Sequence, residues 1–136
     1  MGTRRLARES ALKILYQLDL SGAGIPEATG LFWKDHPASD EVRDFAQNLV
    51  EGVWQDKDRI DALLSRYSAH WKLSRMAAVD KNILRLAVYE LERFPEIPLK
   101  VTLNEAIEIG KSYGSEESSA FINGILDKVA KELRKE

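Results

Sequence analysis

Basic side chains gather at the start of the chain, where they could bind phosphate groups. Arg4, Arg5, Arg8 and Lys13 are opposed there by only Glu9, so the local charge is +3, whereas the whole chain carries −2. Clusters of Arg and Lys neutralise the nucleic-acid backbone, although a solvated helix face can have the same composition. The cluster is compatible with RNA binding, but the net charge gives the chain no general attraction to nucleic acid.

An aromatic side chain near the other end of the chain lies where a core residue is not expected. The last helix is predicted to begin at Ser115, and its apolar stripe comprises Ile122, Ile125, Leu126, Val129, Ala130 and Leu133. Phe121 lies one position off this stripe, four residues after Glu117 and on the same face of the helix. Unpaired nucleobases stack on aromatic rings of this kind.

Residue patterns typical of enzymes, metal sites and membrane spans are missing. The chain has no cysteine, and the two histidines, His36 and His70, have no acidic or histidine neighbours at ligand spacing. No Gly-rich phosphate loop, nucleophile elbow, secretory leader or membrane span is found in the sequence. We therefore expect a cytoplasmic binding protein that is not an enzyme and uses no cofactor or metal.

The hydrophobic pattern is helical along almost the whole sequence. Helices are predicted at residues 3–20, about 27–34, 40 onwards, 57–68, 75–94, 102 onwards and 115 onwards, and no alternating strand is found. The length of 136 residues fits a single domain, 1–136. We expect an all-α fold of about seven helices, with sub-bundles of about 1–70 and 71–136.

Small and polar residues mark the predicted helix ends. Thr102 and Glu105 have the spacing of a capping box, Gly114 is expected to end that helix in a left-handed conformation, and Ser115 to cap the next helix. Gly110 and Gly124 are expected to let two helix backbones approach closely.

The first helix has two apolar faces. With Ala7 at 0° and about 100° per residue, the core stripe of Ala7, Ala11, Ile14, Leu15 and Leu18 spans one side. Leu12, Tyr16 and Leu20 fall on the opposite side, at about 140° to 220°. This second face is either buried as well or an exposed strip that docks another protein or a second copy of the chain.

Three separate stretches closely resemble the NusB family of bacterial transcription antitermination proteins. They are RRLARESALKILYQ, VDKNILRLAVYELERFPEIPLKVTLNEAIEIGKSYG and FINGILDKV, and they occur in the right order, whereas residues 21–70 match in pattern only. The resemblance implies two packed three-helix bundles and a binding protein. It also implies that the chain pairs with the ribosomal protein NusE on single-stranded boxA RNA of ribosomal RNA leader transcripts. In a transcription elongation complex with other Nus factors, the pair would support processive transcription of ribosomal RNA operons.

The resemblance implies an RNA site with two walls. Arg4, Arg5 and Arg8 match its phosphate contacts, and Glu117 and Phe121 match the wall formed by the last two helices. If the fold brings the two walls together, the off-stripe Phe121 can stack a base beside basic side chains.

The resemblance also implies a surface for NusE. Tyr16 and Asp80 match positions on the NusE side, and Leu12 and Leu20 continue the apolar strip of Tyr16. Ala120 stands where many relatives have Lys or Arg. This departure predicts one phosphate contact fewer and weaker RNA binding without the partner.

Two other functions remain open at this point. Some ribosomal RNA cytosine methyltransferases begin with a similar domain, but they need a cofactor-binding domain with a Gly-rich loop, which is not found in this sequence. A helical adaptor that binds only protein is the second alternative. A salt titration of RNA binding distinguishes such an adaptor from an RNA-binding protein.

Overall fold

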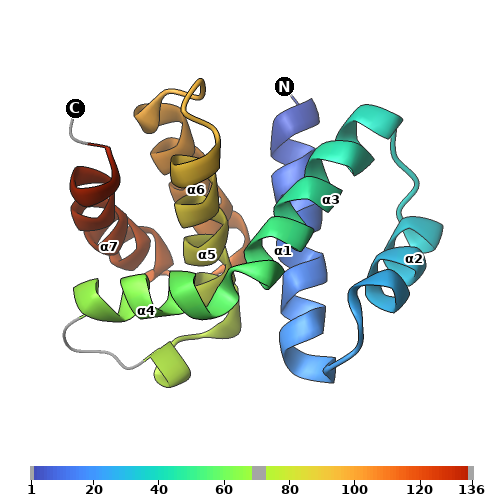
Figure 1. Cartoon of the computed structure of the whole chain (residues 1–136), viewed down its shortest axis with the longest axis horizontal. Coiled ribbons are helices and arrows are strands. Elements are labelled where there is room, and N and C mark those ends of the chain that lie inside the picture. The colour runs from blue at the N-terminus through green and yellow to red at the C-terminus, as the bar shows by residue number, and fades with distance from the viewer. Residues whose placement is uncertain (1, 69–72, 135–136) are drawn as a thin grey trace. The chain divides into compact units, whose positions relative to one another are not determined.

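Seven α-helices and one short 3₁₀ helix make up the described part of the chain, and no strand occurs there (Figure 1). The structure is a computed structural model that describes residues 2–68 and 73–134. The elements are α1 (Thr3–Ser21), α2 (Ile25–Asp35), α3 (Asp40–Gln55), α4 (Lys57–Tyr67), η1 (Leu73–Arg75), α5 (Ala78–Arg93), α6 (Leu99–Tyr113) and α7 (Ser118–Leu133). The predicted all-α class of about seven helices is confirmed.

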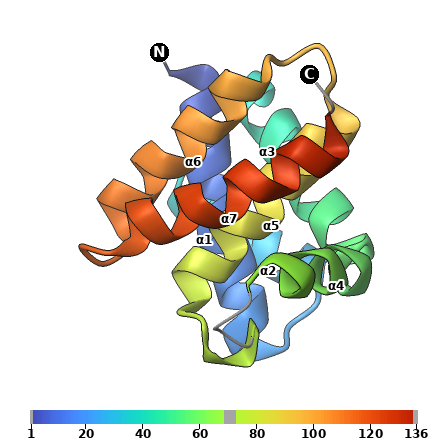
Figure 2. The ribbon, with the colours of Figure 1, turned by 90° about the vertical axis from the view of Figure 1, so that its left-hand side faces the viewer.

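The chain divides into two compact units, Met1–Gln55 and Asp56–Glu136. In the first unit, α1, α2 and α3 pack against one another. In the second, α5, α6 and α7 pack together, and Figure 2 shows α6 and α7 side by side. Helix α4 packs against α5 and α7 and therefore belongs to the second unit. The predicted boundary at residues 70 and 71 lies outside the described residues.

Helix α1 supplies the main core of the first unit. Its predicted stripe is fully buried: Ala7, Ala11, Ile14, Leu15 and Leu18. Helix α3 adds the predicted stripe of Val42, Ala46, Leu49, Val50 and Val53, which is buried as well. Two amphipathic stripes thus meet face to face, as the 3.6-residue period predicts. Gly22 ends α1 with φ 71°, a left-handed conformation that favours glycine.

Helix α5 is buried on nearly all sides, including its polar residues. Arg85 donates from Nε and Nη2 to the two carboxylate oxygens of Asp61 on α4, each at 2.7 Å. Its Nη1 donates to Asn82 Oδ1 at 3.0 Å. Glu90 accepts a hydrogen bond from Thr102 on α6 at 3.4 Å. Buried polar groups need such partners because desolvation without them is costly.

The predicted capping box at Thr102 is wrong. Helix α6 begins three residues earlier, at Leu99 after Pro98, and no side chain caps it. Thr102 is buried inside the helix, where its hydroxyl bonds to Glu90 rather than to a free backbone N–H. Proline at a helix start, with its φ already set, can define the first turn without a capping side chain.

Arg134, just after α7, closes the other end of α5. Its guanidinium donates to the carbonyl oxygens of Leu91 at 3.1 Å, Phe94 at 2.9 Å and Ile97 at 2.7 Å. The last carbonyls of a helix have no partner within the helix. Arg134 satisfies the Leu91 carbonyl and those of the turn that follows, which ties the end of α7 to the α5–α6 connection.

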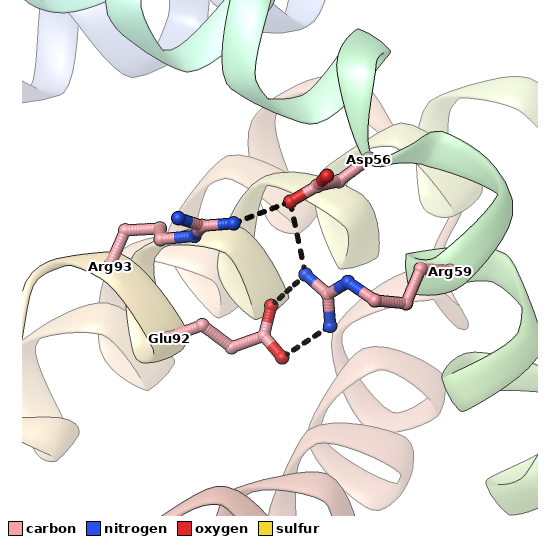
Figure 3. Close-up of polar contacts among 4 residues, drawn as sticks. All are labelled: Asp56, Arg59, Glu92 and Arg93. Atoms are coloured by element: carbon pink, nitrogen blue, oxygen red, sulfur yellow. Dashed lines mark hydrogen bonds and ion pairs between the residues drawn. The ribbon is translucent and has the colours of Figure 1, made fainter.

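A network at the surface joins the start of α4 to the end of α5 (Figure 3). Asp56 Oδ2 accepts hydrogen bonds from Arg59 at 3.1 Å and Arg93 at 2.7 Å, and Arg59 forms two more with Glu92. The bonds from Arg59 and then Arg93 hold the pKa of the Asp56 carboxyl below its usual range. Both arginines are exposed, so solvent screening limits what the network adds to stability.

Removing the carboxylate that pairs with Arg85 should destabilise the second unit. We expect Asp61→Ala to lower the free energy of unfolding by about 3–5 kcal/mol, because a buried guanidinium loses its counter-charge. Urea denaturation followed by circular dichroism measures this loss. The control is Asp58→Ala on the same helix, an exposed acid of the first turn, which should cost at most about 1 kcal/mol through the helix dipole. Equal losses in the two variants would contradict this role of the pair.

Candidate nucleic-acid interface

The corner between α6 and α7 is a tight turn held by Ser118. Helix α7 begins at Ser118 and not at Ser115, so the predicted Ser115 cap is wrong. Instead, Ser118 Oγ accepts the Ser115 backbone N–H at 2.9 Å and donates to Asp80 Oδ1 on α5 at 2.7 Å. Both Ser118 and Asp80 are buried.

Gly114 precedes this turn and is required by space rather than by its backbone angles. Its φ of −97° is not the left-handed conformation that was predicted. A Cβ at this position would lie 2.2 Å from Ser118 Oγ and 2.6 Å from Ser118 Cβ. A side chain at residue 114 would therefore displace the hydroxyl that bonds to Asp80.

Of the two glycines expected at a close helix contact, only Gly110 is in one. A Cβ there would meet Ile122 Cδ1 at 2.9 Å, so α6 and α7 approach closely at this point. Gly124 is exposed, and a Cβ at its position would have no neighbouring atom within 4 Å. The predicted role of Gly124 in a close helix contact is therefore wrong.

A pocket of about 300 Å³ lies at this corner of the second unit. Its lining residues come from η1 and the connection that follows it, from α5, from the α6–α7 turn and from α7: Arg75, Met76, Ala77, Asp80, Ser115, Glu117 and Phe121. Phe121 is half-buried, and Glu117 and Arg75 are exposed at the rim. The aromatic face of Phe121 and the cation of Arg75 are suited to an unpaired base and its phosphate, whereas the carboxylate of Glu117 would repel the phosphate.

Glu117 and Phe121, the two site residues predicted on this side, thus line one pocket. Asp80, predicted for the NusE side, lines the same pocket. The sequence reasoning missed Arg75 and Met76, because it placed them in the first turn of the helix predicted at 75–94. Helix α5 begins only at Ala78, so both residues lie before it.

The three N-terminal arginines differ in accessibility. Arg4 is exposed, with its guanidinium 4.2 Å from the centroid of the Phe45 ring of α3, and Arg5 is half-buried. Arg8 is only 5% exposed, and its guanidinium lies 5.8 Å from the same ring. One turn after Arg4, Arg8 faces α3 and is not presented to solvent. The predicted phosphate contact of Arg8 stays a prediction, and Arg8 is the least accessible of the three arginines.

The strip expected to dock a protein is narrower than predicted. Leu12 is 2% exposed, whereas Tyr16 is 38% and Leu20 62% exposed. Helix α1 is buried over more than its core stripe, and Leu12, at about 140° from Ala7, falls inside that wider buried sector. Leu6, which the sequence reasoning missed, is exposed at about 260°. Leu6, Tyr16 and Leu20 form the exposed apolar face of α1.

The described residues contain neither a metal cluster nor a membrane-spanning helix. Across residues 2–68 and 73–134, no three His, Asp or Glu side chains gather where they could hold a metal ion. No helix in these ranges is both long and apolar enough to cross a membrane. His36 stacks on Phe32, with ring centroids 4.2 Å apart, and His70 lies outside the described residues.

Comparison with known proteins identifies relatives over almost the whole chain. The family model of the NusB family matches residues 5–131. The transcription antitermination protein NusB of Anaeromyxobacter dehalogenans strain 2CP-1 is 53% identical over 131 residues, which is 96% of this chain and 92% of the relative. The protein of the same name from Myxococcus xanthus is 49% identical and covers 99% of both chains.

Solved structures agree with this relationship. The structure of T. maritima NusB has a TM-score of 0.88 at 38% identity and covers 97% of this chain and 92% of its own. A structure of the antitermination factors NusB and NusE in complex with dsRNA has a TM-score of 0.88 at 26% identity, covering 97% and 98%. With a family match from residue 5 to residue 131 and relatives about half identical, the chain belongs to the NusB family.

Proposed function

We propose that this chain is a transcription antitermination factor that binds single-stranded boxA-type RNA together with NusE. The relatives named above are transcription antitermination proteins, and one structural neighbour was solved with NusE and dsRNA. With other Nus factors, the complex would act in the cytoplasm on RNA polymerase that transcribes ribosomal RNA operons. The chain would act by binding, without a catalytic step.

The pocket at the α6–α7 corner is the observation that carries this proposal. Phe121 offers a half-buried ring to an unpaired base, and Arg75 offers a charge to the adjacent phosphate. A helix face that contacts only solvent is not expected to combine a cavity with an aromatic residue outside the apolar stripe. This observation favours RNA binding over an adaptor that binds only protein.

The basic start of α1 is the second element of the proposed RNA site. Arg4 and Arg5 are the accessible candidate phosphate contacts, and Arg8, which is buried, stays a candidate from the resemblance. They lie in the first unit and Phe121 in the second, so the expected meeting of the two walls stays a prediction.

The exposed apolar face of α1 is the proposed surface for NusE. Tyr16 and Leu20 are exposed and keep their predicted role, and Leu6 is added to them. Leu12 is buried, and its predicted contact with NusE stays a prediction. Exposed apolar side chains on one helix face are typical of protein interfaces. Self-association through this face in the absence of NusE also stays a prediction.

Removing the accessible arginines should reduce the salt dependence of RNA binding. We expect the double variant Arg4→Ala, Arg5→Ala to flatten the slope of log affinity against log salt by about 1.4, or 0.7 per phosphate contact on a single strand. The loss should be equal on boxA-type and unrelated strands, because phosphate contacts carry no sequence information. Fluorescence anisotropy at four salt concentrations measures the slope. Lys34→Ala, an exposed cation on α2, is the control, and an unchanged slope in the arginine variant would place the site elsewhere.

A charge on the exposed face of α1 should abolish NusE binding without unfolding the protein. We expect Tyr16→Asp to lose NusE in a pull-down and by calorimetry, while its helical content and melting temperature stay close to the parent values. Leu31→Asp is the control, because Leu31 is also exposed and lies on α2 of the same unit. If Tyr16→Asp unfolds, Tyr16 is a core residue. Equal loss of NusE binding in both variants would contradict a specific docking face.

Glu117 and Phe121 should affect RNA binding in opposite directions. Glu117→Gln removes a carboxylate beside the proposed phosphate path, so it should tighten binding by about 0.5–1 kcal/mol at low salt, and less as salt rises. Phe121→Ala should weaken binding by about 1–3 kcal/mol with little salt dependence, because stacking is lost. RNA affinity at two salt concentrations measures both effects.

Glu116→Gln is the control for the charge effect, since Glu116 is an exposed neighbour that does not line the pocket. The Glu117→Gln variant should lose some tenths of a kcal/mol of stability through the helix dipole. If Glu117→Gln binds RNA more weakly than the parent, the carboxylate accepts a hydrogen bond from a base. The proposed repulsion between Glu117 and phosphate would then be wrong.

A further inference from the structure

Asp80 is placed where it supports the corner between α6 and α7. Its side chain is nine-tenths buried, and its Oδ1 accepts the hydroxyl of Ser118 at 2.7 Å. Asp80 lies in the first turn of α5 and Ser118 is the first residue of α7, so the bond joins the starts of two helices. A carboxylate is favourable there, because both helix starts are positive ends of backbone dipoles.

We propose that Asp80 is a positioning residue for RNA binding, which it supports by holding Ser118 and, through it, the turn that carries Glu117 and Phe121. This inference rests on the proposed function. It adds to the role in NusE binding that the resemblance implies for Asp80, which stays a prediction.

The first step in this argument is the orientation of the Ser118 hydroxyl. A serine hydroxyl has one hydrogen to donate and lone pairs that accept. Because Asp80 takes the hydrogen, a lone pair of Ser118 Oγ is left for the Ser115 N–H at 2.9 Å. Without Asp80, the hydroxyl can rotate and the backbone of the turn loses a defined acceptor.

The second step is the lack of free space around Ser118. Gly114 and Gly110 have no room for a Cβ, because Ser118 Oγ would lie 2.2 Å from one and Ile122 Cδ1 2.9 Å from the other. In so closely packed a corner, a displacement of the Ser118 side chain also displaces the neighbouring residues, because there is no void beside it to move into. The turn and the first turn of α7 therefore move together.

The third step connects Ser118 to the RNA-binding side chains. Phe121 is three residues after Ser118 and lies one turn further on the same face of α7. Its backbone N–H donates to the Glu117 carbonyl at 3.1 Å in the first turn of the helix. Asp80, Glu117 and Phe121 line the same pocket, so the orientation of the first turn sets how the ring faces a bound base.

A mutant cycle with two binding partners tests the proposal. The variants are Asp80→Ala, Ser118→Ala and their combination, with Asp80→Asn as the conservative variant, since its amide oxygen can still accept from Ser118. Ser119→Ala is the matched control, because Ser119 is the next residue and its hydroxyl makes only one long bond, at 3.5 Å to Ile107 O. The probes are a labelled single-stranded boxA-type RNA of about 12 nucleotides and purified NusE.

We expect Asp80→Ala and Ser118→Ala each to weaken RNA binding by about threefold to tenfold, and the double variant to bind no more weakly than either. Asp80→Asn and Ser119→Ala should stay within about twofold of the parent. NusE binding should be unchanged in Ser118→Ala, because Ser118 is buried and is not among the residues predicted for the NusE side. Hydrogen exchange at the Ser115 amide should become faster in Asp80→Ala, in Ser118→Ala and in the double variant, but not in Asp80→Asn or Ser119→Ala.

An RNA affinity unchanged in Ser118→Ala would overturn the proposal, because the Ser118 hydroxyl would then not position the RNA-binding side chains. Additive losses in the double variant would overturn it too. A parent protein that does not bind the RNA, or a Phe121→Ala variant that binds as the parent does, would instead overturn the proposed function. The Ser118→Ala variant keeps the test decisive even if Asp80→Ala does not fold.

Discussion

The burial of polar side chains on α5 is the constraint on which the second unit depends. Ionised and amide groups inside a protein need hydrogen-bond partners, and an apolar neighbour cannot supply them. Each helix packed on α5 supplies one: α4 provides Asp61 for Arg85, α6 provides Thr102 for Glu90, and α7 provides Ser118 for Asp80. Because these bonds are directional, they set the register of three helices against α5. Apolar packing alone would leave that register less well defined.

The same constraint links stability to the candidate RNA site. The start of α7 is held by Asp80, and the residue after its end, Arg134, donates to three carbonyls at the end of α5 and in the turn that follows. Helix α7 is thus anchored at both ends. The anchored start carries Glu117 and Phe121, so the bonds that satisfy α5 also orient the proposed binding residues. The exposed network around Asp56 joins α4 to α5 as well, but its charges are screened by solvent.

The helices could be predicted from the sequence because each has an apolar stripe with a period of 3.6 residues. Their starts were harder to predict. Thr102 with Glu105 fits a capping box, yet Pro98 already sets the first turn and Glu90 binds the threonine hydroxyl. Likewise, Ser115 looked like a cap because the pattern cannot show that Ser118 is the serine that bonds to another helix. Local patterns do not contain these contacts between helices.

The sequence by itself determined that the chain is all-α, which residues form each apolar stripe, and that it resembles the NusB family, because these follow from short-range patterns along the chain. Only the tertiary structure decided that Leu12 and Arg8 are buried while Tyr16 and Leu20 are exposed, since both sets lie on the same helix and differ only in what packs against them. It also decided that Asp80 meets Ser118, 38 residues away in the sequence. The bond forms because the starts of α5 and α7 come together in the packed unit, and no spacing within either helix encodes that meeting.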